Sequence, residues 1–408
     1  MYEAKGNKEI KQATVKWNED TIYALGLYKR VTTLVGIWPT NNRILTGIQI
    51  GVYITFHLSS VFIFFQKFLE YGNCGTTMEI VDTLSVCMAS VQICIKSFIA
   101  WFKNHEFRHV VDSAVMDWSC VEEEQSHSVM LVYARKGRVL LMCQMAVGFS
   151  TAFPLMLDRF PKIVEVIDEV KNESIFVRNI PLLPRCWISL TMSEYSYLAY
   201  WTLVVIFIWT LSIATVCCNV FVYGFGLYVY TQFEILSTSV NIINGNENIS
   251  EQRRLIKMFA KRHNHLLNIA NDLENGSTFI ILSEVTVIIF VGCIAGVMLL
   301  IGLRDHDSQT IIAMVIRLTL VMMQLFIYNF MGECLSNQTE KLQTAIYNCP
   351  WYELSSRTAK DMKLIMIRSN NPFRLTAGKL SDMNLISFKS VVKSMFSFFS
   401  VLRLMLQN

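Results

Sequence analysis

Long apolar runs alternate with polar segments along the whole chain, and this pattern predicts a helical membrane protein. A helix of about 20 residues at about 1.5 Å per residue spans the hydrocarbon layer of a bilayer. The runs that satisfy this length lie at residues 44–66, 79–102, 139–157, 195–230, 278–303, 310–331 and 382–407. The fourth run exceeds the thickness of a bilayer, so its helix is expected to continue into water. The predicted fold class is all-α, with seven transmembrane helices.

Composition supports the membrane assignment and narrows the possible functions. Of the 408 residues, 53% are hydrophobic and 17% are charged, whereas soluble domains carry about 25% charged residues. The net charge of +4 gives no reason to expect a nucleic-acid partner. The polar first 20 residues have no apolar stretch of the kind that a cleavable signal contains. We therefore expect the first span itself to direct the chain to the membrane.

The distribution of Lys and Arg predicts the orientation of the chain. With seven spans, 24 of these residues lie on the side of the N-terminus and 7 on the other side. Basic loops favour the cytoplasm, so we expect a cytoplasmic N-terminus and an extracellular C-terminus. The sequon at Asn172 then lies outside and is the expected glycosylation site, while those at Asn248, Asn275 and Asn337 lie in the cytosol. A G-protein-coupled receptor has the opposite orientation and is a less favoured alternative.

The last span, residues 382–407, is polar for a helix that faces lipid. At 100° per residue, one stripe of this helix contains Met383, Ser387, Ser390, Ser394, Ser397, Phe398, Val401 and Met405. A serine-lined face that ends in apolar side chains suits a water-filled path closed by an apolar constriction. Small serine side chains also permit close packing between membrane helices. The segment alone leaves both interpretations open.

Few other side chains suggest a chemical role. Glu284 and Arg317 lie at different depths in neighbouring spans, so we do not expect a direct ion pair between them. Arg317 either binds a ligand carbonyl group or satisfies a helix end, and we favour the second. The pair His263 and His265 is expected to be solvated on a charged helix. The sequence shows no metal-ligand spacing, phosphate loop or nucleophile motif, so neither an enzyme nor a cofactor is expected.

Cysteine pairing is left open by the sequence. Cys74 and Cys186 are expected on the same side of the membrane, so a disulfide between them is possible. The pairing of cysteines cannot be deduced from sequence alone.

Two blocks toward the C-terminal end resemble the insect odorant receptor family. Within residues 324–355 the shared features are Gln324-Leu-Phe, Gly332-Glu333, Ala345-Ile-Tyr and Trp351-Tyr352, and within residues 362–405 they are Leu375-Thr-Ala-Gly378 and the stretch from Ser397 to Arg403. The resemblance implies a subunit of a tetrameric, ligand-gated, non-selective cation channel. Such channels lie in the plasma membrane of olfactory sensory neuron dendrites.

The resemblance also implies a partner. The chain lacks the large cytoplasmic insertion of the shared odorant receptor co-receptor, which indicates a tuning subunit that assembles with that co-receptor. A homotetramer similar to the gustatory receptors is the alternative. The Thr-Tyr…Gln-Phe signature of those receptors is missing here.

The resemblance assigns roles to parts of the chain. We expect a cytoplasmic segment at residues 1–43, a ligand-binding bundle of six helices at residues 44–331, and an anchor with the pore helix at residues 332–408. The pore gate is expected at Val401 and Met405. A small volatile hydrophobic ligand is expected in an apolar cavity of the outer half, surrounded by membrane lipid. By depth, its lining is expected to include Leu84, Met88, Met145, Gly148, Ala152, Tyr200, Val204, Leu318, Val321 and Met322.

Overall fold

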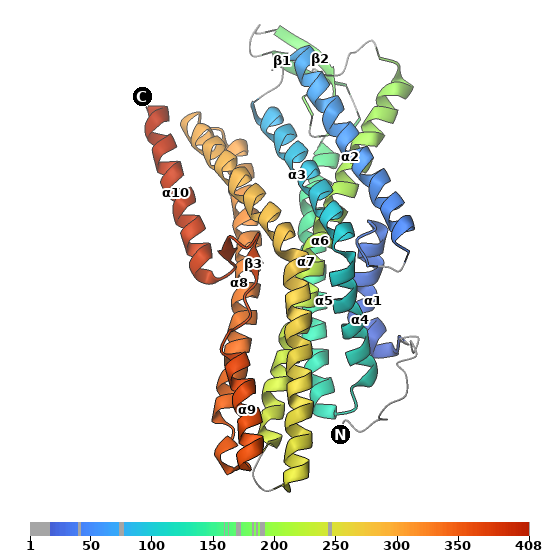
Figure 1. Ribbon diagram of the computed structural model, residues 1–408. Coiled ribbons are helices and arrows are strands. Elements are labelled where there is room, and N and C mark those ends of the chain that lie inside the picture. The colour runs from blue at the N-terminus through green and yellow to red at the C-terminus, as the bar shows by residue number, and fades with distance from the viewer. Residues whose placement is uncertain are drawn as a thin grey trace.

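The computed structural model describes residues 17–39, 42–72, 77–158, 160–161, 163–168, 173–181, 183–184, 187, 192–243 and 247–407. Long helices dominate the fold (Figure 1). In chain order they are α1 (Glu19–Leu34), α2 (Arg43–Tyr71), α3 (Thr77–Phe102), α4 (Asn104–Cys120), α5 (Glu124–Asp158), α6 (Glu194–Ser239), α7 (Ile249–Arg304), α8 (Ser308–Asn348), α9 (Ser356–Ser369) and α10 (Leu385–Gln407). Short 3₁₀ turns follow α6 at Val240–Ile242 and α8 at Trp351–Glu353.

Each of the seven predicted spans corresponds to a long helix of its own, although the last helix begins at Leu385 and not at Asp382. Among the described residues, five of these helices are long and apolar enough to cross a membrane, namely α2, α3, α6, α7 and α8. The remaining two predicted spans correspond to α5 and α10, which have 35 and 23 residues. Helix α6 has 46 residues, which confirms that the fourth apolar run belongs to a helix longer than a bilayer requires.

Two antiparallel hairpins interrupt the helical pattern. Strand β1 (Ile163–Asp168) pairs with β2 (Glu173–Arg178), and β3 (Thr376–Ala377) pairs with β4 (Ser381–Asp382). The first hairpin lies in the polar segment between the third and fourth predicted spans, and the second lies just before α10. The prediction missed the first because β1 and β2 do not alternate strictly between apolar and polar residues, and the second because β3 and β4 have two residues each.

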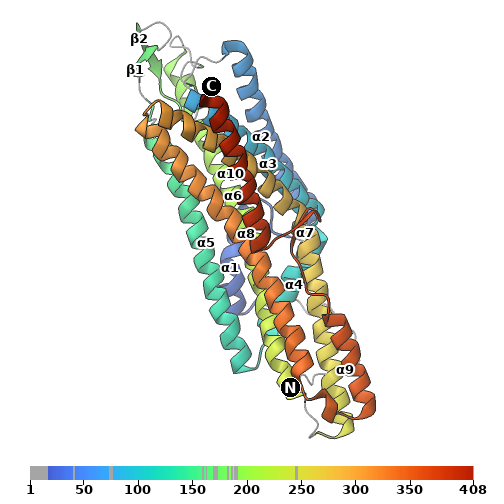
Figure 2. The same cartoon turned by 90° about the vertical axis from the view of Figure 1, so that its left-hand side faces the viewer.

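The two ends of the bundle contain different elements (Figures 1 and 2). The β1–β2 hairpin and the last turns of α10 lie at one end, which we call the outer end. Helix α9 and the adjoining parts of α6, α7 and α8 lie at the other, which we call the inner end. The names outer and inner follow the orientation expected from the charged loops.

The largest hydrophobic core fills the inner end. It joins α1, α4, α6, α7 and α8 through buried side chains such as Phe107, Phe233, Ile269 and Leu335. Tyr28 of α1 also belongs to this core, where its ring packs against Gly224 of α6. Helix α1 is therefore part of the folded bundle.

Candidate functional site

Helix α10 is attached to the bundle at its first turn. The side chain of Asn384 accepts a hydrogen bond from the backbone N–H of Ser387 at 2.7 Å, as an N-cap residue does. The carboxylate of Glu333 on α8 accepts a second bond, from the backbone N–H of Leu385 at 3.3 Å. Glu333 belongs to the Gly332-Glu333 motif, so this motif fixes where the last helix starts.

The β3–β4 hairpin docks the segment before α10 onto α7. The hydroxyl of Thr376 donates to the Glu274 carboxylate at 2.5 Å, and Lys379 forms an ion pair with the same side chain. The backbone N–H of Gly378 donates to the carbonyl of Thr278 at 2.9 Å. Gly378 has a φ of 62°, a left-handed conformation that glycine adopts without strain. The Leu375-Thr-Ala-Gly378 motif is thus a structural clamp.

One face of α10 packs against α7 and α8. Met395 lies against Gly292, and a side chain at Gly296 would begin 2.7 Å from the ring of Phe399. The ring of Phe388 meets Phe326 of α8 edge-on, with the centroids 5.6 Å apart. At 100° per residue, the three α10 side chains share a stripe about 40° wide.

The serine-lined face of α10 points away from this contact. At 100° per residue from Met395, it lies about 200° to 260° around the helix. Its exposed members are Ser390, Ser394, Ser397 and Val401. Val401 is 50% exposed within the single chain. This face is free to meet an aqueous axis or a neighbouring chain.

Other members of the expected stripe differ in their surroundings. Phe398 is exposed and Ser387 is half-buried. Met405 belongs to α10, but its side chain lies outside the described residues. Met383 precedes the helix and is buried against Gly332 of α8. Its inclusion in the stripe was wrong, because the helix begins two residues later.

The ten residues expected around a ligand do not all line one described cavity. Val204 lines an outer pocket, Tyr200 packs beside it, Leu318 packs against a small cluster of α7 and α8, and Met145 packs against the main core. Near α7, Val321 and Met322 lie beside Gly292. Leu84 is 47% exposed and Met88 is half-buried.

Gly148 serves close packing between α5 and α6. A side chain there would begin 3.1 Å from a methyl group of Val216. Ala152 lies in α5, but its side chain is outside the described residues. Asn172, Cys74 and Cys186 also lie outside the described residues.

The outer pocket is small and almost entirely apolar. It has a volume of about 10 Å³ and is lined by Phe64, Thr83, Val86, Leu183, Val204, Phe207 and Ile208. The Thr83 hydroxyl donates to the carbonyl of Glu79 at 2.7 Å, so its hydrogen is directed at the backbone. Such a volume holds at most about one water molecule. A larger apolar guest requires α2, α3 and α6 to move apart.

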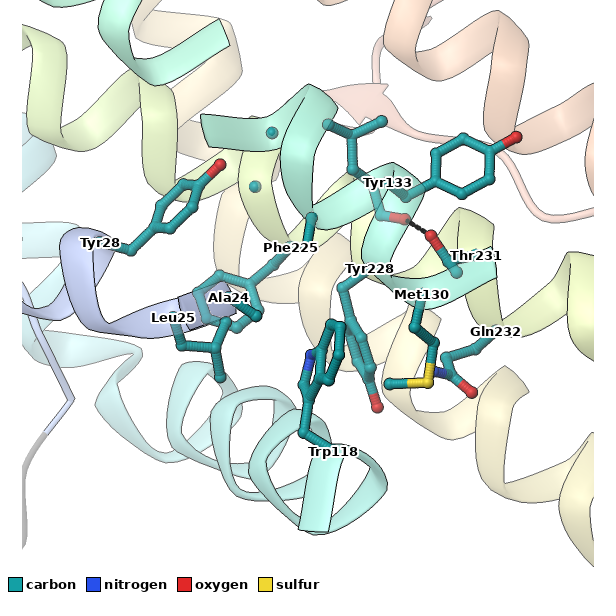
Figure 3. Close-up of a pocket in the computed structure, with 14 residues that line it drawn as sticks. Ala24, Leu25, Tyr28, Trp118, Met130, Tyr133, Phe225, Tyr228, Thr231 and Gln232 are labelled. Carbon is teal, nitrogen blue, oxygen red and sulfur yellow. Dashed lines mark hydrogen bonds between the residues drawn. The ribbon is translucent and has the colours of Figure 1, made fainter. Parts of the chain in front are cut away.

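A larger pocket of about 40 Å³ lies at the inner end, between α1, α4, α5 and α6 (Figure 3). Tyr28, Trp118, Tyr133 and Tyr228 contribute to its aromatic lining (Figure 3). This pocket could not be predicted from the sequence, because the periodicity of α1 does not specify which helices lie beside it.

Polar side chains beside the inner pocket hold α4, α6 and α7 together. The hydroxyl of Tyr228 donates to the Asp117 carboxylate at 2.6 Å. The guanidinium of Arg262 donates to Asp117 at 2.8 Å and to the amide oxygen of Gln232 at 2.7 Å.

The intramembrane charges have partners on α3. Arg317 of α8 forms an ion pair with Asp82, and Glu284 of α7 forms one with Lys96. This pairing agrees with the prediction that Glu284 and Arg317 do not meet. The expectation that Arg317 satisfies a helix end was wrong, because α3 presents a carboxylate to it. The presence of Asp82 and Lys96 at different depths of the second apolar run could have indicated that α3 carries the partners of both charges.

The expectation of two solvated histidines was also wrong. His263 is 3% exposed and stacks near Phe259. Burial, with a smaller contribution from Arg368, lowers the pKa of His263 to about 4. His265 is half-buried and lies 3.0 Å from the hydroxyl of Ser113. The charged neighbours in the sequence concealed that α7 is covered by α4 and α9 here.

Three comparisons relate the chain to known proteins. A family model described as 7tm odorant receptor matches residues 76–396. Odorant receptor 10 of Aedes albopictus is 26% identical over 168 residues, which cover 41% of this chain and 44% of that protein. Odorant receptor 13a of Drosophila melanogaster is 23% identical over 191 residues, which cover 43% of this chain and 46% of that protein. The chain thus spans a little less than half the length of these relatives.

Solved structures show the same architecture. The insect olfactory receptor OR5 from Machilis hrabei, in complex with eugenol, is similar with a TM-score of 0.68 at 12% identity. The match covers 95% of this chain and 100% of that chain. A second structure of OR5 from Machilis hrabei gives a TM-score of 0.69 at the same identity. At this identity the likeness establishes the fold.

Proposed function

Because this chain belongs to the 7tm odorant receptor family, we propose that it is the odorant-binding subunit of a ligand-gated, non-selective cation channel. The chain is a membrane protein with the seven-helix fold of insect odorant receptors, and it is a receptor and not an enzyme. The proposal places it in the plasma membrane of olfactory sensory neuron dendrites, with its N-terminus in the cytoplasm.

The observation that carries the proposal is the two-faced character of α10. Its Met395 face is packed on the bundle, while the face of Ser390, Ser397 and Val401 is exposed. Four copies arranged around an axis would join these faces into a hydrophilic path. Val401 and Met405 would close that path with apolar side chains.

The proposed assembly is a tetramer that includes the odorant receptor co-receptor. Only residues 240–248 connect α6 to α7, so this chain lacks the cytoplasmic insertion expected of the co-receptor. The division into a cytoplasmic segment at residues 1–43, a binding bundle at residues 44–331 and an anchor with pore helix at residues 332–408 belongs to the same proposal. So does glycosylation of Asn172.

The proposed ligand is a small volatile hydrophobic molecule that enters the outer end. An apolar pocket that presents mainly hydrocarbon, with Val204 in its wall, suits such a molecule. The ten residues expected by depth remain the proposed lining, with Val204 as the best supported. Entry of the ligand would separate α2, α3 and α6, and α7 and α8 would carry that movement to α10.

Electrophysiology with and without the co-receptor tests the proposal. Cells that express both chains are expected to pass cation current in response to odorants, and cells with this chain alone are not. Current from this chain alone would favour the homotetrameric alternative. Absence of current across a broad odorant panel, with both chains at the cell surface, would reject the channel function.

A variant of the gate tests the pore assignment. Val401→Ser is expected to raise the basal current severalfold, because the apolar constriction becomes polar. Phe396→Ser is the control, since Phe396 is an exposed α10 residue about 100° from Met395, outside the serine-lined face. Equal basal currents in the two variants would remove Val401 from the gate.

A further inference from the structure

A lysine and a glutamate are buried together in the membrane-spanning part of the bundle. Lys96 of α3 is 0% exposed and Glu284 of α7 is 5% exposed, and the two form an ion pair. The side-chain amide of Gln92, one turn earlier on α3, donates to the same Glu284 oxygen at 2.5 Å. Charges in such a place are costly to bury and commonly mark a functional element.

The pair is connected to two further helices. Lys96 also donates to the amide oxygen of Asn219 on α6 at 3.0 Å. The same oxygen accepts a hydrogen bond from the hydroxyl of Tyr328 on α8 at 2.9 Å. We call Gln92, Lys96, Asn219, Glu284 and Tyr328 the buried polar cluster. Its directional bonds join α3, α6, α7 and α8 at one level of the bundle.

The cluster joins helices that line the outer pocket to helices that contact the pore helix. Helices α3 and α6 contribute Thr83 and Val204 to the wall of the outer pocket. On α7, Glu284 lies about two turns before Gly292, against which Met395 of α10 packs. The four helices of the cluster therefore include two that would sense a ligand and two that hold α10.

An ion pair transmits displacement differently from an apolar contact. Apolar side chains can slide past one another with little change in energy, whereas a buried charge that loses its partner is strongly destabilised. Helix α7 is consequently held to α3, and a shift of α3 is followed by α7. A coupling element of this kind needs two sites and a shared structural state that both influence.

We propose that Lys96 and Glu284 are positioning residues that couple the ligand-binding helices to α10 and so set the opening equilibrium of the channel. The inference rests on the proposed channel function and adds the route by which the outer end reaches the pore. Neither side chain is required to touch the ligand or the permeating ion.

The test is a set of charge variants measured together with the co-receptor. The doubly neutral variant Lys96→Met with Glu284→Gln removes both charges, so that no unpaired charge stays buried. Its odorant concentration for half-maximal current, the EC50, is expected to rise about tenfold at equal surface amount, within the range of known allosteric couplings. The exchange variant Lys96→Glu with Glu284→Lys restores a pair and is expected to return the EC50 to within about threefold of wild type.

A matched control uses another Lys–Glu pair of the chain. Lys103 and Glu106 form an ion pair of 2.9 Å near the start of α4, and both side chains are partly exposed. Neutralising both, as Lys103→Met with Glu106→Gln, is expected to leave the EC50 within about twofold of wild type.

The outcomes separate this inference from the channel proposal. No current from the wild-type chain with the co-receptor would count against the channel function itself. Wild-type current together with an unchanged EC50 and basal current in the doubly neutral variant would overturn the coupling role alone. If that variant does not reach the cell surface, Glu284→Gln is measured instead, because its amide keeps the shape of the carboxylate. Loss of every variant from the surface would assign the cluster to folding and would also overturn the inference.

Discussion

The outer and inner ends of the bundle are held together in different ways. At the inner end, one continuous core is reinforced by polar bonds such as those of Asp117 with Tyr228 and Arg262. At the outer end, the core divides into small clusters around Phe207 and Met314, and the pocket wall is almost entirely hydrocarbon. Regions with fewer buried contacts open at lower free energy. The difference indicates that the outer end changes its conformation at a lower cost in free energy than the inner end does.

The largest expected effect concerns stability at the inner end. Arg262→Gln leaves the Asp117 carboxylate largely buried without its cation, which should cost about 2 kcal/mol of unfolding free energy. The melting temperature of the detergent-solubilised protein is expected to fall by a few degrees. The EC50 of the channels that reach the surface should stay the same.

The control for this variant is Arg254→Gln. Arg254 pairs with Glu251 on the surface of α7, where ion pairs contribute less than about 1 kcal/mol. If Arg262→Gln kept wild-type stability but changed the EC50, the inner end would take part in the ligand response. That result would contradict the division of roles between the two ends.

The intermediate effect concerns ligand response at the outer end. Val204→Ala removes two methyl groups from the pocket wall and is expected to raise the EC50 of a tightly fitting odorant about fivefold. Leu203→Ala is the control, since Leu203 is exposed, lies about 100° around α6 from Val204 and does not line the pocket. Equal odorant responses of the two variants would show that the outer pocket is not the ligand site.

The smallest effect is a pH dependence at the inner end. The pKa of His263 is about 4 in the folded chain and about 6.5 in an unfolded chain. As the pH falls, the unfolded state therefore binds more protons than the folded state. The contribution of neutral His263 to the unfolding free energy is complete well above pH 6.5 and declines toward pH 4. Between pH 7.5 and pH 6 the loss should be about 0.8 kcal/mol.

Thermal unfolding at several pH values checks this prediction. His263→Gln removes the titrating group, so its melting temperature should fall less steeply between pH 7.5 and pH 6. Parallel pH profiles for wild type and His263→Gln would show that His263 does not control this stability.

The parts of the fold that depend on single segments could be predicted. The seven spans and the length of α6 follow from apolar run lengths and bilayer thickness. The polar face of α10 follows from helical periodicity alone. These properties require no knowledge of neighbouring helices.

The parts that depend on contacts between distant segments could not be predicted. Lys96 and Glu284 are 188 positions apart, and nothing in either span specifies which helix faces the other. His263 is buried because α4 and α9 cover one side of α7. The wall of the outer pocket likewise combines α2, α3 and α6, and only Val204 was selected from it.

The uncovered serine face of α10 has a consequence for how ion conduction and ligand selectivity would divide among the chains of the proposed assembly. In the proposed assembly, one chain would supply only part of the lining of the ion path, and the path would form only when several chains stand together. Conductance would then depend on every subunit, whereas the choice of odorant could depend on a single one.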